Sequence, residues 1–194
     1  MNKQEAKQQI QKLVEKYQRV LETGKIKSYN EAQSRNEFIE PLFEFLGWDM
    51  RNLTTDNEVT TEENVSGGRV DLAFRFGNIP VFFLEAKAMK VDLDEWKWAE
   101  QAINYSWNKN VTWAVLTDFE SIKIFNAEIP PKSVSQNLFI ELNCRDFINR
   151  FDQLWLLSKE SFEQKLLDKE AQKWGKLTQR KQVGEKLFED LMSW

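Results

Sequence analysis

Two apolar segments joined by a short turn limit most strongly how this chain can fold. Residues 69–76 and 80–87 are rich in Val, Phe and Leu, and the Gly-Asn-Ile at 77–79 between them has the composition of a hairpin turn. Residues 81–84 form an unbroken apolar run that only a buried strand accommodates. The sequence therefore predicts a hairpin inside a covered sheet.

Helical and strand patterns alternate around this hairpin. Helical spacing is predicted for residues 4–22, 28–47 and 94–107, and further strands for 111–116, 122–125 and 137–142. Helices are expected near 145–157, 159–168 and 182–194. The fold class predicted is α/β, with a mixed β-sheet flanked by helices and a C-terminal helical appendage. We expect a core domain at 1–142 and a helical extension at 143–194. Its last helix stops in mid-pattern, so the natural chain is expected to continue.

Composition removes several kinds of chemistry. The 194 residues include no His and a single Cys, which excludes imidazole-dependent mechanisms, thiolate metal cages and a disulfide framework. Cys144 is expected to be inert. No apolar run is long enough to span a membrane and the polar start is no signal peptide, so a cytoplasmic location is expected. The net charge of −4 argues against nucleic-acid binding driven by bulk charge.

One cluster of charged residues falls on the predicted hairpin. With the turn centred on Asn78, Asp71 lies opposite Glu85, and opposed side chains on one face of a sheet are about 5 Å apart. Strand alternation puts Lys87 on the same face. A register slip of one residue would separate the three groups.

Two opposed carboxylates repel each other unless a proton or a cation joins them. Oxygen ligands without His or Cys suit Mg²⁺ or Mn²⁺, which keep water and accept phosphate oxygens from a substrate. Lys87 beside such an ion could hold or deprotonate an attacking water. The alternative is a surface salt bridge, against which the buried run before Glu85 counts.

An Asp, a hairpin and then Glu-x-Lys on the next strand resemble the PD-(D/E)XK nuclease superfamily. The resemblance extends to neighbouring segments, which are similar to parts of restriction-enzyme nuclease domains: residues 30–35, 38–42, 46–49, 114–120 and 124–126. Gln101 and Tyr105 match the Gln-x-x-x-Tyr motif that follows the active site in type I restriction subunits and their relatives. The chain most resembles the N-terminal nuclease domain of type IIG restriction–modification enzymes, well over 28–126 and more loosely beyond. Val70 replaces the superfamily's Pro, and no methyltransferase motif is present.

The resemblance implies an endonuclease that hydrolyses double-stranded DNA with Mg²⁺, for which Mn²⁺ can substitute. It implies Asp71 and Glu85 as metal ligands with the Ala86 carbonyl as a third, and Lys87 as the group that positions and activates water. It further implies in-line attack that leaves a 5′-phosphate. Methyltransferase and target-recognition domains are expected elsewhere in a longer prokaryotic protein.

Two more residues receive roles from the resemblance. Gln101 would stand at the edge of the site with Tyr105 one helical turn away, and Glu31 would reach the metal through water. The alternatives are a capping-box partner of Ser28 for Glu31, a surface amide for Gln101 and a core position for Tyr105.

Other features have a functional and a structural interpretation. Base stacking or core packing is possible for Trp96, Trp98, Trp107 and Trp113. Phosphate contacts or simple solvation are possible for Lys173, Lys176, Arg180 and Lys181.

Two other functions stay open. One is a superfamily nuclease outside restriction, in repair or mobile-element processing. The other is a catalytically inactive fold that serves as a DNA- or protein-binding module, which the intact Asp71, Glu85 and Lys87 count against.

Overall fold

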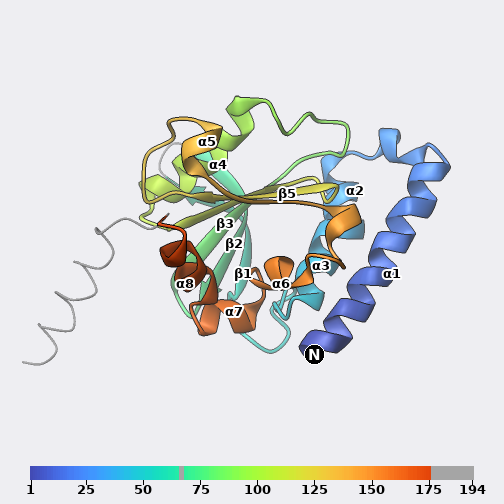
Figure 1. The fold of residues 1–194 in the computed structure, drawn as a ribbon, viewed down its shortest axis with the longest axis horizontal. Helices are drawn as coiled ribbons and strands as arrows, with labels where there is room; N and C mark the ends of the chain where they lie inside the picture. Colours follow the sequence, from blue (N-terminus) through green and yellow to red (C-terminus); the bar gives the residue numbers. More distant parts are fainter. Residues whose placement is uncertain (66–67, 176–194) are drawn as a thin grey trace, which may run out of the picture.

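A computed structural model describes residues 1–65 and 68–175, which form one sheet covered by helices on both faces (Figure 1). Six strands lie side by side in chain order: β1 Val59–Val65, β2 Gly68–Phe76, β3 Ile79–Ala86, β4 Trp113–Thr117, β5 Ser121–Asn126 and β6 Leu138–Asn143. Neighbours are antiparallel except for β3 and β4, which are parallel. The predicted α/β class with a mixed sheet is confirmed. Strand β1 was not predicted, because most of its residues are polar.

The hairpin has the predicted pairing but a different turn. Leu72 lies opposite Leu84, so Asp71 and Glu85 are the next residues along the two strands. Ile79 pairs with Phe76 and begins β3, so its predicted place in the turn is wrong. A register shift between Phe74 and Arg75 compensates for the shorter turn and preserves the pairing at the charged end.

The N-terminal helices differ from the prediction at one cap. The segments are α1 Lys3–Glu22, a 3₁₀ turn Lys25–Ser28, α2 Glu31–Ser34, a π-helical turn Arg35–Ile39 and α3 Glu40–Phe45. Asn30 caps α2, where its side chain accepts from the Gln33 N–H at 2.8 Å and Gln33 reaches back at 3.1 Å. The predicted capping box of Ser28 with Glu31 is wrong, since the Ser28 hydroxyl donates to the Lys25 carbonyl instead.

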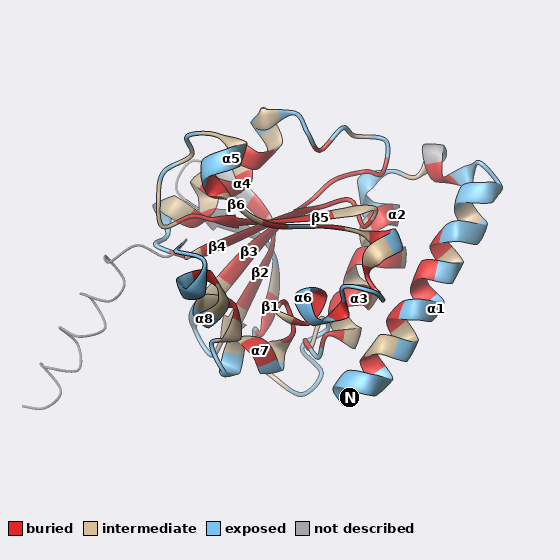
Figure 2. Cartoon of the chain, in the orientation of Figure 1, coloured by how far each residue is buried: buried red, intermediate tan, exposed pale blue. Residues whose placement is uncertain are grey.

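The sheet separates two packed layers, and Figure 2 shows buried residues along both. On one face Leu72, Phe74, Phe82 and Leu84 join a large core with α1, α3 and the C-terminal helices. On the other face helix α4 Trp96–Asn108 packs on β4 and β5. Because side chains alternate along a strand, the odd-numbered residues at the end of β3 face α4. This alternation places Glu85 and Lys87 beneath that helix.

The C-terminal helices contribute to the main core. They are the 3₁₀ turn Cys144–Asp146, α6 Phe151–Trp155, α7 Lys159–Glu163 and α8 Leu166–Lys173, and a short α5 Val134–Asn137 precedes β6. Trp48 Nε1 donates to the Leu157 carbonyl at 2.9 Å, and the Phe162 ring stacks on Phe82 at 4.9 Å. These helices therefore pack on the sheet, and the division at residue 142 remains a sequence-based prediction. The helix predicted at 182–194 lies outside the described residues.

Two smaller expectations concern the ends of the fold. Burial raises the pKa of the Cys144 thiol to about 12, which keeps it protonated, as an inert thiol should be. Lys173 forms an ion pair with Glu170 at 3.0 Å, while the rest of the predicted basic stretch lies outside the described residues. In the described part of the chain, no helix combines the length and apolarity that crossing a bilayer requires.

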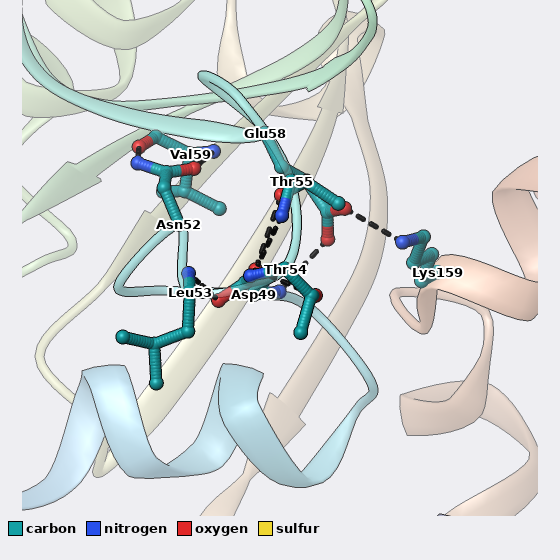
Figure 3. A network of polar contacts seen from close by, with 8 residues as sticks. All are labelled: Asp49, Asn52, Leu53, Thr54, Thr55, Glu58, Val59 and Lys159. Carbon is teal, nitrogen blue, oxygen red and sulfur yellow. Dashed lines mark hydrogen bonds and ion pairs between the residues drawn. The ribbon is translucent and has the colours of Figure 1, made fainter.

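The loop between α3 and β1 is held by one carboxylate (Figure 3). Asp49 accepts five hydrogen bonds of 2.7–3.2 Å from backbone N–H and hydroxyl groups of residues 53–55. These bonds hold the pKa of the Asp49 carboxyl far below its usual range. Glu58 accepts from the Asp49 N–H at 2.8 Å and from Lys159 Nζ at 2.6 Å. Glu58 thus joins the two ends of the loop to each other and to Lys159, the first residue of α7.

Candidate active site

The end of β3 brings the predicted charged residues together. Glu85 and Lys87 are only 3% and 7% exposed, and Lys87 Nζ donates to Glu85 Oε1 at 2.5 Å. Asp71, half-buried on β2, accepts the Ala86 N–H through Oδ2 at 2.7 Å. The three side chains therefore meet on one face at the end of the hairpin. The surface salt bridge considered as an alternative is wrong, because the ion pair is buried.

The surroundings of Glu85 strongly perturb the pKa of its carboxyl group. Burial first, and then the negative charge of Asp71, raise its pKa to about 7, although the hydrogen bond from Lys87 acts in the opposite direction. Its Oε2 atom is buried and has no hydrogen-bond partner in the described part of the chain. A buried carboxylate oxygen of this kind is costly unless a proton or a cation reaches it.

Helix α4 closes the site from above. Gln101 Nε2 donates to Glu85 Oε1 at 2.8 Å and to the Tyr105 hydroxyl at 3.1 Å. Gln101 is therefore not the surface amide of the alternative interpretation. Tyr105 packs against Ala73 and Phe83 while its hydroxyl contacts Gln101, so it is both a core residue and a neighbour of the site.

Glu31 lies at the first position of α2, within electrostatic range of the site. Partial desolvation and the charge of Asp71 raise the pKa of Glu31, while Lys87 and Arg35 lower it. It shares no direct hydrogen bond with Asp71, Glu85 or Lys87 in the described residues. The predicted neighbourhood is therefore present, and the predicted water-mediated role stays a prediction.

The sequence offered base stacking or core packing for Trp98 and did not predict its contact with Lys87. Its ring centre lies 4.7 Å from Lys87 Nζ, the geometry of a cation–π contact. The available signal was its position three residues before Gln101, which puts both on one face of α4. For the other tryptophans, core packing is confirmed at Trp113, which is 1% exposed.

The ligand types at this site suit a hard divalent cation. Asp71 and Glu85 supply carboxylates, and Ala86, the residue directly after Glu85, supplies a backbone carbonyl. The unpartnered Oε2 of Glu85 and its repulsion by Asp71 are what a cation would relieve. Among the described residues no group of three or more His, Cys, Asp or Glu side chains has metal-binding geometry. A bound ion would therefore keep ligands that the protein does not supply.

Comparison with known proteins relates the sequence of the chain to restriction enzymes. No family model matches the chain. The Escherichia coli protein "Type II restriction enzyme and methyltransferase RM.Eco57I" is 31% identical to it over 176 residues, which cover 83% of this chain. The chain is homologous to part of a restriction enzyme. The match spans 17% of the E. coli restriction enzyme's own length, so this chain corresponds to less than a fifth of that relative.

Two solved structures of restriction enzymes are also similar. A fragment assigned to the HsdR subunit of a type I restriction enzyme from Vibrio vulnificus YJ016 has a TM-score of 0.42 and 19% identity, covering 51% of this chain and 21% of that one. The type IIG restriction endonuclease BpuSI has a TM-score of 0.45 and 21% identity, covering 62% of this chain and 16% of that one.

Proposed function

We propose that this chain is the endonuclease part of a restriction–modification enzyme and hydrolyses phosphodiester bonds of double-stranded DNA. The observation that carries the proposal is the convergence of half-buried Asp71 with buried Glu85 and Lys87, in which one Glu85 oxygen has no hydrogen-bond partner among the described residues. Homology to a restriction enzyme supports the restriction role over repair or mobile-element processing.

The site would hold Mg²⁺, or Mn²⁺ in its place, through Asp71, Glu85 and the Ala86 carbonyl. A divalent ion, when bound, supplies positive charge that lowers the pKa of water and neutralises charge on a phosphoryl group. A small set of protein ligands agrees with Mg²⁺, which usually retains waters and takes phosphate oxygens from its substrate.

The chain's own residues would then orient the reaction. Lys87 uses one N–H on Glu85, which leaves donors for an attacking water or a phosphate oxygen. Gln101 fixes the Glu85 oxygen that Lys87 also contacts, so the carboxylate cannot rotate freely. Glu31 adds a negative charge at the mouth of the site, where it can accept a hydrogen bond from water. In-line attack leaving a 5′-phosphate is the expected course.

Sequence recognition belongs elsewhere in this proposal. A net charge of −4 gives the chain little general attraction for DNA. The name of the E. coli relative includes a methyltransferase, and we propose that methyltransferase and target-recognition domains are covalently linked to this chain in a longer cytoplasmic protein of a prokaryote.

Nicking of supercoiled plasmid DNA tests the proposal. We expect slow, sequence-independent nicking by the chain with Mn²⁺ or Mg²⁺, arrest by EDTA, and poor recovery with Zn²⁺ because the site lacks His and Cys. Lys87→Ala should abolish nicking, whereas the matched control Lys90→Ala, at an exposed lysine three residues away, should nick normally.

Two outcomes would count against this function. DNA binding without nicking at any concentration of Mg²⁺ or Mn²⁺ would instead indicate the catalytically inactive binding module. Normal nicking by Lys87→Ala would remove that lysine from the mechanism.

A further inference from the structure

The ammonium of Lys87 is held by two groups, and only one of them is a carboxylate. Lys87 Nζ has three N–H bonds, and one of them points to Glu85 Oε1 at 2.5 Å. The indole ring of Trp98 lies on another side of Nζ, 4.7 Å from ring centre to nitrogen. Within the described residues no other acceptor contacts this nitrogen. The carboxylate and the ring together therefore limit the directions that the remaining N–H can take.

Helix α4 carries both the residue that contacts the ammonium of Lys87 and the residue that contacts the carboxylate of Glu85. Trp98 and Gln101 are three residues apart and lie on the same helix face. Gln101 holds the carboxylate of the ion pair at 2.8 Å, and Trp98 covers its ammonium. One rigid helix thus contacts both members of the buried pair, and a rotation of the helix would displace both together.

The surroundings of Trp98 show that the ring is not simply packing material. Its Nε1 atom is buried without a hydrogen-bond acceptor in the described part of the chain, which costs free energy that a phenylalanine or leucine would not incur. The ring's charged neighbours are two ammonium groups, Lys87 and the exposed Lys97, whose Nζ lies 4.6 Å from the ring centre. Each lysine is paired with a carboxylate at 2.5 Å, but Lys97 is exposed to water whereas Lys87 is buried, so the ring replaces more of the lost hydration of Lys87.

We propose that Trp98 is a positioning residue that fixes the Lys87 ammonium for the reaction. The ring attracts the positive charge over its face and keeps water away from that side, so the free N–H of Lys87 is directed towards the substrate side of the site. This inference rests on the proposed nuclease function for its effect on rate, but not for the contact between the two side chains.

Nuclear magnetic resonance of the chain tests the contact directly. The ε-methylene protons of Lys87, identified by their loss in Lys87→Ala, should be shifted upfield by the indole ring current. The shift should persist in reduced form in Trp98→Phe, which keeps an aromatic face, and disappear in Trp98→Leu. The matched control is Trp96→Leu, because Trp96 is on the same helix and packs against the same apolar cluster. It should leave the Lys87 signals unchanged.

Plasmid nicking tests the consequence for rate. A lost cation–π contact corresponds to about a tenfold lower rate in Trp98→Leu, with most of the rate recovered in Trp98→Phe. Trp96→Leu should stay within about twofold of the unmodified chain, since it loses packing but not the cation contact.

Three results separate the possibilities. Unshifted Lys87 protons in the unmodified chain, or equal losses of rate in Trp98→Leu and Trp96→Leu, would overturn the positioning role. Shifted protons that respond to Trp98→Leu support it even if the unmodified chain never nicks DNA, an outcome that would reject the nuclease function alone. Recovery of rate by Trp98→Phe but not by Trp98→Leu supports both.

Discussion

Asp49 and Glu85 place a carboxylate in two opposite settings within one fold. Asp49 lies in the loop before β1, where five hydrogen bonds from its own loop satisfy it and lower its pKa (Figure 3). Glu85 lies at the end of β3, where burial raises its pKa to about 7 and one of its oxygens accepts no hydrogen bond from residues 1–65 or 68–175. Asp49 precedes the first residue of β1 by ten positions, whereas Glu85 is part of β3 itself.

The difference shows how a structural carboxylate can be separated from a functional one. A carboxylate whose lone pairs are filled by local donors has no capacity left for a ligand, and it stabilises the loop that surrounds it. A carboxylate that the fold buries without enough donors destabilises the protein until something else binds. Counting the donors around each acidic group therefore identifies the candidate site more sharply than counting charges.

The largest expected effect is on DNA cleavage. Asp71→Asn and Glu85→Gln should each reduce Mn²⁺-dependent plasmid nicking by at least about a hundredfold, because each removes a charge that would hold the ion. Asp49→Asn should nick at close to the normal rate. Circular dichroism and DNA binding provide the controls for folding. Equal loss of activity in the Asp49 variant would break the distinction between the two carboxylates.

The second effect is on the pH dependence of stability. Below about pH 4.5 the Glu85 carboxyl is protonated in both the folded and the unfolded chain. As the pH rises towards 7, the unfolded chain loses this proton while the folded chain keeps it. Stability should therefore fall across this window by about 3 kcal/mol and level off above it.

Comparison with Glu85→Gln isolates this contribution in urea titrations at several pH values. Burial also raises the pKa of Asp118 to about 7, so the unmodified chain titrates at more than one group in the window. The variant should lose only the Glu85 part of the slope. An unchanged slope would mean that Glu85 does not hold a proton in the folded chain.

The third effect is stabilisation by metal. At pH 8, where Glu85 is ionised, a saturating concentration of Mn²⁺ should stabilise the chain by roughly 1–2 kcal/mol, since the ion binds only the folded site. Asp71→Asn should abolish this gain, whereas Asp49→Asn should retain it. Thermal melts with and without Mn²⁺ provide the measurement. A gain that survives in Asp71→Asn would place the ion elsewhere.

The smallest expected effect is the loss of stability on substituting Asp49, and the contribution of Asp49 to stability should depend on pH with the opposite sign to that of Glu85. A pKa held below its usual value of 3.8 adds stability above that pH, and the stability is lost as the pH falls below it. Asp49→Ala should lower the melting temperature at pH 7 and flatten the acid-induced loss. Nicking should be nearly unaffected, because in the described part of the chain Asp49 bonds within its own loop and not to the site. A melting curve equal to that of the unmodified chain would show that the five bonds are not needed to hold the loop.

Much of the fold follows from apolar patterning in the sequence. The helices at 4–22 and 94–107 and most strands lie near their predicted limits, because each buries one face with a clear period. Strand β1 was not predicted from the sequence because Val59–Val65 is mostly polar. The conformation of the loop at 49–58 was not predicted either. It depends on residues with left-handed backbone conformation, such as Asn52 and Asn57, which the sequence pattern alone does not identify.

For the site, the residue types could be predicted but their energetics could not. Asp71, Glu85 and Lys87 follow from hairpin alternation, although the actual turn is shorter and a register shift restores the pairing. The raised pKa of Glu85 and the contact of Trp98 with Lys87 depend on how α4 covers the sheet. Such burial arises from tertiary packing, which a single sequence does not reveal.

The π-helical turn at Arg35–Ile39 gives the second helix two independent orientations. A π turn adds about one residue relative to an α-helix, so the segment before it is rotated by roughly 100° with respect to the segment after it. Leu42 and Phe43 can therefore point into the core while Glu31 faces the neighbourhood of Asp71.

Deleting one residue within 35–39 would remove this rotation and turn Glu31 away from the site, while Leu42 and Phe43 would stay in the core. The titration of Glu31 would then no longer respond to Asp71→Asn. The acid at the mouth of the site is thus set by an irregularity in the helix rather than by its own contacts, so its position could change in evolution without repacking the core.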